Sequence, residues 1–237
     1  VVNAMFELIA GQSPYKSPTD MGVNMAGNCI VDDAVCCEAS RKEIVRRYYK
    51  CLCEQKITGT AKESERYKLE LLMNQAGLTM GAREVEKQAH ARSEATGGAP
   101  ATAIELSDGT VITGKTGPLL GATASALINA LKYLAGIPQE TDLVSAAAIE
   151  PIQTLKTNYL GGKNPRLHTD EILIALSMSA ATSDAARLAL EQIPNLRGCQ
   201  AHTSVMLSDV DVISFRKLGI ELTCEAKAEQ KKKYQKD

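Results

Sequence analysis

The sequence contains no tryptophan and few other aromatic residues, with seven tyrosines and two phenylalanines among 237 residues. A core made from this chain must therefore consist mainly of Ala, Leu, Ile, Val and Met. Abundant Ala and Leu favour helices over a β-sandwich. Hydrophobic residues make up 44% and charged residues 23%, so the composition is that of a globular protein with one large domain or two small ones.

The chain also lacks an excess of charge of either sign. A net charge of −1 gives no bulk attraction to nucleic acid or to an anionic membrane, and we expect neither as a partner. No apolar run approaches the roughly 20 residues that span a bilayer, and the first residues do not resemble a signal peptide. Seven cysteines without an export signal predict a cytoplasmic protein rather than a disulfide framework. The absent initiator methionine is expected of a piece of a longer protein.

Residues 1–98 are predicted to be mainly helical, as the C-terminal part of a preceding domain plus a connector. Apolar spacing predicts amphipathic helices from Asp32 to Cys53 and from Ser64 to Ala76. The stretch from Ala82 to Ala95 is almost purely polar, which predicts a solvated connector or an arm lying on a partner.

Before the first of these helices, the segment from Pro14 to Asn28 is a predicted loop. Its hydrogen-bonding side chains are candidates for a binding site, because loops on a rigid scaffold often carry function. They serve equally well as satisfied turn residues. The candidates are Lys16, Ser17, Thr19, Asp20 and Asn24.

Residues 99–225 have a different pattern. Runs from Ala101 to Leu106 and from Thr110 to Lys115 flank Asp108-Gly109, which predicts a β-hairpin. A buried helix follows from Pro118 to Gly136, then three more helices, a strand within residues 198–207, a short helix, and a strand within residues 220–224. The fold class is therefore α/β (α+β), with a mixed sheet covered by helices in three layers. The Lys-rich residues 226–237 are predicted to be disordered.

The run from Gly109 to Thr116 matches the phosphate-loop pattern G-x-x-x-x-G-K-T. Its middle residues are β-branched and follow a hairpin turn, so they favour an extended strand that cannot wrap a phosphate. A weaker site is predicted at Lys115, Thr116 and Gly117, where a helix N-terminus would favour an anion. The alternative is that Thr116 caps the helix and Lys115 points to water.

The positions of the histidines and cysteines give little evidence of a catalytic or metal-binding site. Cys36 and Cys51 lie on one predicted helix about 22 Å apart, too far to share a metal, and no metal site or particular cofactor is predicted. His168 precedes Thr169-Asp170-Glu171 at a helix start, and His202 lies in a strand. Either histidine is a candidate general base or metal ligand, with a structural role as the alternative. His90 is expected to be exposed. The weak catalytic candidates are His168, His202, Asp170 and Glu171.

Four segments resemble the uncharacterised bacterial family DUF1846, also known as UPF0371. They are Ser13–Met25, Leu71–Gly77, Asn164–Glu171 and Gly219–Cys224. Members of that family are roughly twice as long, so the resemblance implies that this chain is the C-terminal half. The N-terminal half, with a phosphate-loop-like stretch of its own, would then be its partner.

The resemblance also implies a cytidine deaminase-like topology. In deaminases the helix after the first hairpin opens with a zinc-binding His or Cys and a general-acid Glu. The corresponding residues Pro118–Ala126 contain none of these, which excludes zinc deamination.

These observations predict a protein of unassigned activity that contributes to a nucleotide- or phosphometabolite-binding site. The hypothesis rests on Lys115 and Thr116 at the helix start and on the polar loop, and His168 and His202 would join them if the fold brings them close. The alternative is a non-catalytic structural or oligomerisation module, for which the polar arm would suit a homo-oligomer.

Overall fold

The computed structural model describes residues 2–12, 32–59 and 63–229. At its centre lies a mixed four-stranded sheet with the order β2-β1-β3-β4. Strands β1 (Ala101–Glu105) and β2 (Val111–Lys115) form an antiparallel hairpin, as the sequence predicts. Strand β3 (Gln200–Thr203) pairs antiparallel with β1, and β4 (Glu221–Cys224) pairs parallel with β3. The predicted mixed sheet is confirmed.

The hairpin turn follows from its Asp-Gly pair. Gly109 adopts φ +82°, a left-handed conformation that glycine tolerates without strain. The Asp108 carboxylate accepts a 2.9 Å hydrogen bond from the amide of Thr110, and Leu106 N–H donates to Thr110 C=O at 2.9 Å. These local bonds fix the pairing of Ile104 with Ile112.

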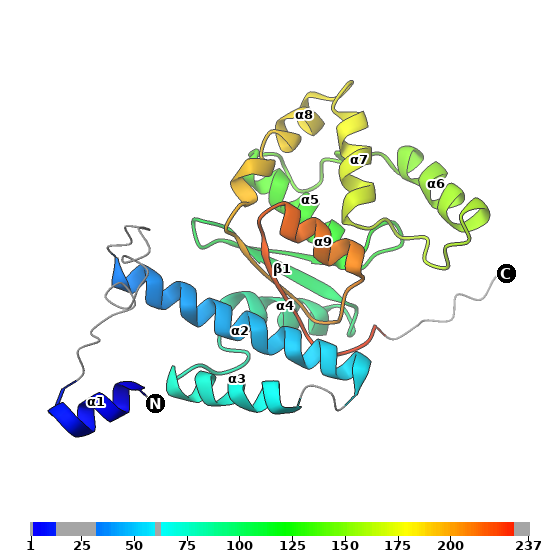
Figure 1. Cartoon of the computed structure of the whole chain (residues 1–237). Coiled ribbons are helices and arrows are strands. Elements are labelled where there is room, and N and C mark those ends of the chain that lie inside the picture. Colours follow the sequence, from blue (N-terminus) through cyan, green and yellow to red (C-terminus); the bar gives the residue numbers. More distant parts are fainter. Residues whose placement is uncertain (1, 13–31, 60–62, 230–237) are drawn as a thin grey trace.

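Helices cover both faces of the sheet (Figure 1). One face carries α5 (Ala122–Leu134) and α9 (Asp209–Lys217), with α7 (Thr169–Ser179) and α8 (Asp184–Leu190) packed beyond them. The other face carries α4 (Glu84–Ala95) and α2 (Asp33–Thr58), and α3 (Glu63–Gln75) packs on α2. The remaining helical segments in the described ranges are α1 (Val2–Ala10), α6 (Ala146–Thr154), the π-helical η3 (Leu155–Tyr159) and the 3₁₀-helical η4 (Ile193–Leu196).

The main core lies between the sheet and α5. Strand alternation directs Ile104 and Ala201 into it, while their neighbours Ala103 and His202 point to the opposite face, toward α4. Besides Ile104, the fully buried larger side chains of this core are Leu127, Leu131, Leu167, Ile172, Leu176, Leu196 and Phe215. Apart from Phe215 these side chains are aliphatic, as the scarcity of aromatic residues requires.

The polar stretch from Ala82 to Ala95 was predicted to be a solvated connector or an arm, and this is wrong. It forms α4, which lies against β1, β2 and β3. Only a narrow stripe of Val85, Glu86 and Ala89 is buried. Small residues on both α4 and the sheet allow the helix to pack with so little apolar surface. Ala89 on α4 and Ala103 on β1 lie in the same buried cluster.

The helix after the hairpin also begins later than predicted. Residues 116–121 form a loop in which Leu120 bridges to Leu167, and α5 starts at Ala122 with Gly121 as its N-cap. Pro118 is therefore not in the first turn, and Thr116 does not cap the helix.

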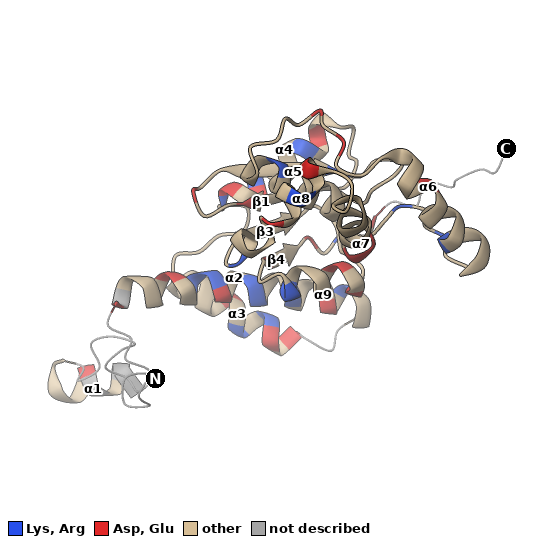
Figure 2. Ribbon diagram, turned by 90° about the horizontal axis from the view of Figure 1, so that it is seen from above, with Lys and Arg blue, Asp and Glu red and all other residues tan. Residues whose placement is uncertain are grey.

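Charges of both signs alternate along α2 and α3 (Figure 2). Glu43 accepts hydrogen bonds from Arg46 and Arg47 on α2, and Arg66 pairs with Glu70 on α3. None of the helices in the described ranges combines the length and apolar character needed to cross a bilayer.

Candidate functional site

A hollow of about 160 Å³ opens at the N-terminus of α5. Three segments form most of its lining: the loop and first turn of α5, the residues before α7, and the connection from β3 to the first turn of α9, with Pro100 and Glu229 added from elsewhere in the chain. Its polar lining consists of Thr116, Thr123, Asn164, Arg166, His168, Ser208, Asp211 and Glu229. The hollow therefore contains two of the residues predicted from the sequence, Thr116 and His168.

Asp211 organises one wall of this hollow. Its side chain is buried, and one carboxylate oxygen accepts bonds from the Thr169 amide (3.0 Å), the Thr169 hydroxyl (2.8 Å) and the Thr123 hydroxyl (3.2 Å). The other oxygen accepts from Ser208 Oγ at 2.8 Å and lies 2.9 Å from His168 Nδ1. Asp211 thereby ties the first turns of α5, α7 and α9 together.

The protonation of this pair follows from its contacts. Burial alone would raise the pKa of Asp211, but the hydrogen bonds from His168, Thr169 and Ser208 outweigh burial and the pKa is lowered. The hydrogen bond to Asp211 raises the pKa of His168 against the opposing effect of burial. An ionised Asp211 therefore favours a protonated imidazole, with Nδ1–H donating to the carboxylate.

The arrangement differs from a Ser-His-Asp triad. Ser208 Oγ lies 3.5 Å from Nδ1 of His168, the same nitrogen that meets Asp211. A triad needs the serine and the aspartate on opposite ring nitrogens. Within the described residues, all hydrogen bonds of the His168 ring involve Nδ1, which leaves Nε2 for a ligand.

The two acidic candidates beside His168 have structural contacts. Glu171 accepts a 2.7 Å hydrogen bond from the backbone N–H of His168 and forms a 2.8 Å ion pair with Lys156. It therefore caps α7. Asp170 is exposed and accepts the amide of Glu171. Neither carboxylate is among the residues that line the hollow.

The predicted anion site at Lys115, Thr116 and Gly117 does not form as a unit. Thr116 N–H donates to Pro100 C=O at 2.8 Å and Gly117 N–H to Leu120 C=O at 2.9 Å, so neither amide is available to an anion. Lys115 and Gly117 line a second hollow of about 340 Å³, whereas Thr116 lines the first. The loop candidates Lys16, Ser17, Thr19, Asp20 and Asn24 lie outside the described residues.

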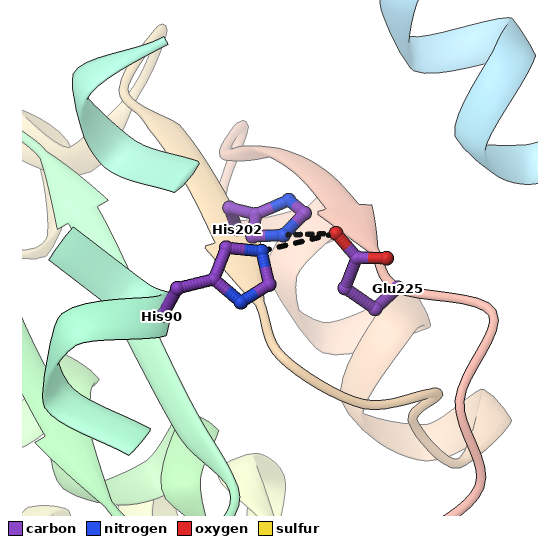
Figure 3. A group of neighbouring side chains, drawn as sticks. All are labelled: His90, His202 and Glu225. Carbon is purple, nitrogen blue, oxygen red and sulfur yellow. Dashed lines mark hydrogen bonds and ion pairs between the residues drawn. The ribbon is translucent and has the colours of Figure 1, made fainter. Parts of the chain in front are cut away.

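His202 lies on the other face of the sheet, away from His168, in a cluster that the sequence did not predict. His90 on α4, His202 on β3 and Glu225 after β4 each present one ligand-type atom, and these atoms lie within 4.8 Å of one another (Figure 3). His90 was expected to be exposed, but its side chain is only 43% exposed and its Nε2 lies 3.2 Å from Glu225. The three positions are far apart in sequence, so no spacing motif could reveal them.

Comparison with known proteins supports the family resemblance. Residues 81–234 match the family model described as the C-terminal domain of unknown function DUF1846, and residues 1–77 match its N-terminal counterpart. The match therefore extends beyond the C-terminal domain, in contrast to the expectation of a C-terminal half alone.

Curated relatives agree with these matches. A UPF0371 protein of Corynebacterium glutamicum is 51% identical over 236 residues, covering 100% of this chain and 47% of the relative. A UPF0371 protein of Streptococcus pyogenes is 47% identical with the same coverage. The chain spans about half the length of the curated relatives it matches, and it belongs to the DUF1846 family of proteins of unknown function.

Proposed function

We propose that the hollow beside His168 binds the phosphate group of a small molecule, so that this chain contributes to a nucleotide- or phosphometabolite-binding site. One observation carries the proposal: the Asp211-held imidazole lines the same hollow as the N-terminus of α5, which Gly121 leaves without a side-chain cap. The first amides of a helix have no intrahelical partner and favour an anion.

The charges of the lining suit a phosphate. Arg166 and a protonated His168 supply two positive charges, which the carboxylates of Asp211 and Glu229 balance in the absence of a ligand. Asp211 is occupied by five hydrogen bonds from its own surroundings. An anion in the hollow would meet donors: the α5 amides, the Thr116 hydroxyl and the His168 ring. Guanidinium groups match phosphate geometry particularly well.

The hollow already holds an anionic group of this chain. Glu229 pairs with the guanidinium of Arg166 at 2.7 Å, and both residues line the hollow. The Glu229 carboxylate, from the segment after β4, thus forms the ion pair with Arg166 that a ligand phosphate would form. Such an internal carboxylate supports an anion site and implies that a ligand must displace it.

Isothermal titration calorimetry with inorganic phosphate and with pyrophosphate tests this function. We expect saturable binding that weakens by roughly tenfold to a hundredfold in Arg166→Gln and in His168→Gln, the effect of losing one charge-assisted hydrogen bond. Affinity should also fall as the pH rises through the raised pKa of His168, because the neutral ring loses its charge.

His90→Gln is the matched control, because it removes a histidine from the opposite face of the sheet. Binding by this variant should equal that of the wild type. Absence of saturable binding, or equal affinities in His168→Gln and His90→Gln, would refute the proposal.

A second function, an assembly surface between copies of this chain, is favoured by exposed apolar side chains. Helices α6 and η3 project from one side of the fold (Figure 1), and Leu155, Tyr159 and Leu160 there are exposed, as are Ile174 and Met178 on α7. Burial of such a patch in a dimer is favourable. Light scattering should give a dimer mass that Tyr159→Glu reduces to a monomer. A monomeric wild type would reject this function.

The cytidine deaminase-like topology remains a proposal of its own. It is supported by the strand order β2-β1-β3-β4 and by α5 following the hairpin directly. Helix α5 opens with Ala122, Thr123 and Ala124, so the proposed likeness is one of topology alone and carries no deaminase chemistry.

A further inference from the structure

We propose that His90, His202 and Glu225 bind a divalent first-row transition-metal ion, with Zn²⁺ the best fit, through two imidazole Nε2 atoms and one carboxylate oxygen. The side chains come from α4, β3 and the residue after β4, and both rings point at the same oxygen of Glu225 (Figure 3). Two imidazoles and a carboxylate form a common ligand set for Zn²⁺ and for Fe²⁺.

The distances agree with a tetrahedral ion. A zinc ion with bonds of about 2.0–2.1 Å places its ligand atoms about 3.3–3.4 Å apart. The Glu225 oxygen lies 3.2 Å from Nε2 of His90 and 3.4 Å from Nε2 of His202. The third edge, between the two nitrogens, is within 4.8 Å, so a small rotation of the half-exposed His90 ring would complete the site.

His202 carries the strongest argument, because its buried nitrogen lacks a hydrogen bond. Its side chain is 0% exposed, and the 3.4 Å approach of Nε2 to Glu225 is an ion-pair contact. Among the described residues Nε2 has no hydrogen-bond partner of acceptable geometry. A buried polar atom without a partner is costly. A metal ion at the centre of the cluster would satisfy this nitrogen.

The hydrogen bonds of Thr223 determine which nitrogen of His202 carries the proton. Its hydroxyl donates to Ala201 C=O at 3.1 Å and accepts from Arg83 at 2.6 Å. A hydroxyl has one donor and two acceptor positions, so the remaining contact, 2.8 Å to Nδ1 of His202, must be accepted from Nδ1–H. The neutral ring then directs the lone pair of Nε2 at the cluster, which is the tautomer that a metal requires.

Surrounding groups hold the ligands and balance charge. Glu225 N–H donates to Thr203 C=O at 3.0 Å, which extends the pairing of β3 and β4 by one residue. The Tyr49 ring lies edge-on to His202, with centroids 5.1 Å apart. Arg83 would repel a cation, but it forms an ion pair with the buried Glu86, so the cluster retains the negative charge of Glu225. The exposed side of His90 leaves a coordination position open to solvent.

Competition between Zn²⁺ and a chromophoric chelator measures the affinity in the purified protein. We expect about one Zn²⁺ per chain, no comparable binding of Mg²⁺, and binding at least roughly a hundredfold weaker in His90→Ala and Glu225→Gln. His168→Gln, which removes a histidine from the other face, should bind Zn²⁺ as the wild type does. Absence of saturable binding, or full affinity in Glu225→Gln, overturns the proposal.

Two further measurements test the orientation of His202 and the identity of the ligand atoms. Thr223→Val removes the hydroxyl that orients His202 and should weaken Zn²⁺ binding by roughly 10- to 100-fold. Its matched control is Thr102→Val, since Thr102 is also buried in the sheet and its hydroxyl has no partner in the described part of the chain. Cysteine ligation would give Co²⁺ a thiolate charge-transfer absorption. That absorption in the stoichiometric complex would assign the metal to thiols and overturn the proposal.

Discussion

Replacement of Gly114 by alanine should destabilise the fold severely, because this glycine lies directly beneath α5. A Cβ built on Gly114 would lie 2.1 Å from the backbone nitrogen of Ala126 and 2.6 Å from its Cα, where ordinary contact begins at 3.4 Å. Helix α5 would have to move by more than 1 Å away from β2. Both clashing groups are backbone, so no side-chain rotation can relieve the overlap.

The expected cost follows from this geometry. Overpacking a core typically costs about 1–3 kcal/mol, and a backbone clash belongs at the upper end of that range. Alanine reduces the entropy of the unfolded chain, which offsets about 0.4–1 kcal/mol. We therefore expect a net loss of about 2 kcal/mol or more, seen as a lower urea midpoint in circular dichroism with an unchanged m-value.

Gly117→Ala, three residues further along the chain, is the matched control. A Cβ there would meet nothing within 4 Å, and Gly117 is not in the left-handed region, so the change in unfolding free energy should stay within about 0.5 kcal/mol. If Gly114→Ala is as stable as Gly117→Ala, then α5 does not lie as close to Gly114 as it does in this structure. If Gly114→Ala instead keeps its stability and loses nucleotide binding, the phosphate-loop interpretation would be restored.

Three further predictions concern the hollow beside His168. Asp211→Asn should lower the unfolding free energy by about 3 kcal/mol, because it removes one partner of a buried charged pair; a loss below about 1 kcal/mol in urea denaturation would contradict this. Stability measured across pH should be greatest between the unfolded pKa values of Asp and His, roughly pH 4 to 6.5. The lowered pKa of Asp211 makes its contribution fade as the pH falls through the folded value, and the raised pKa of His168 makes its contribution fade as the pH rises through the folded value. Asp211→Asn should weaken the loss of stability on both the acidic and the alkaline side of this maximum. An unchanged dependence of stability on pH would refute the assignment of these effects to Asp211 and His168. Glu229→Gln should raise phosphate affinity by about fivefold, near 1 kcal/mol, because it frees Arg166 from a partly exposed ion pair; calorimetry showing weaker binding would argue against competition.

The elements that depend on local chemistry were predictable from the sequence. Asp108-Gly109 determines the hairpin, Ser208 caps α9 by accepting the amide of Asp211, and apolar spacing marks α5. The prediction that the phosphate-loop pattern forms an extended strand agrees with β2, which runs through Val111–Lys115. Each of these features is decided within a few residues, which is the range over which a sequence pattern is informative.

The sites depend on contacts between distant segments, and those could not be predicted. His168 meets Asp211 across 43 positions, and His90 meets Glu225 across 135. The position of helix α4 could not be predicted from its hydrophobic pattern either. A polar helix with a narrow apolar stripe can pack on a sheet when the facing side chains of the sheet are small. Lys115 and Thr116 were expected to act together, yet adjacent residues at a strand end face opposite sides, and they line different hollows.

The short segment after β4 connects the two candidate sites, although only its first residue was assigned to the folded domain from the sequence. Glu225 reaches the histidine cluster, Lys227 C=O accepts the amide of Met206 at 2.8 Å, and Glu229 pairs with Arg166. The two carboxylates differ in what a ligand does to them. A metal ion would bind directly to Glu225, whereas a phosphate must displace Glu229 from Arg166. Glu225 is held separately through its own amide by Thr203. Displacement of Glu229 can therefore release the outer part of the segment without disturbing Glu225, so the two sites need not be coupled even though one stretch of chain serves both.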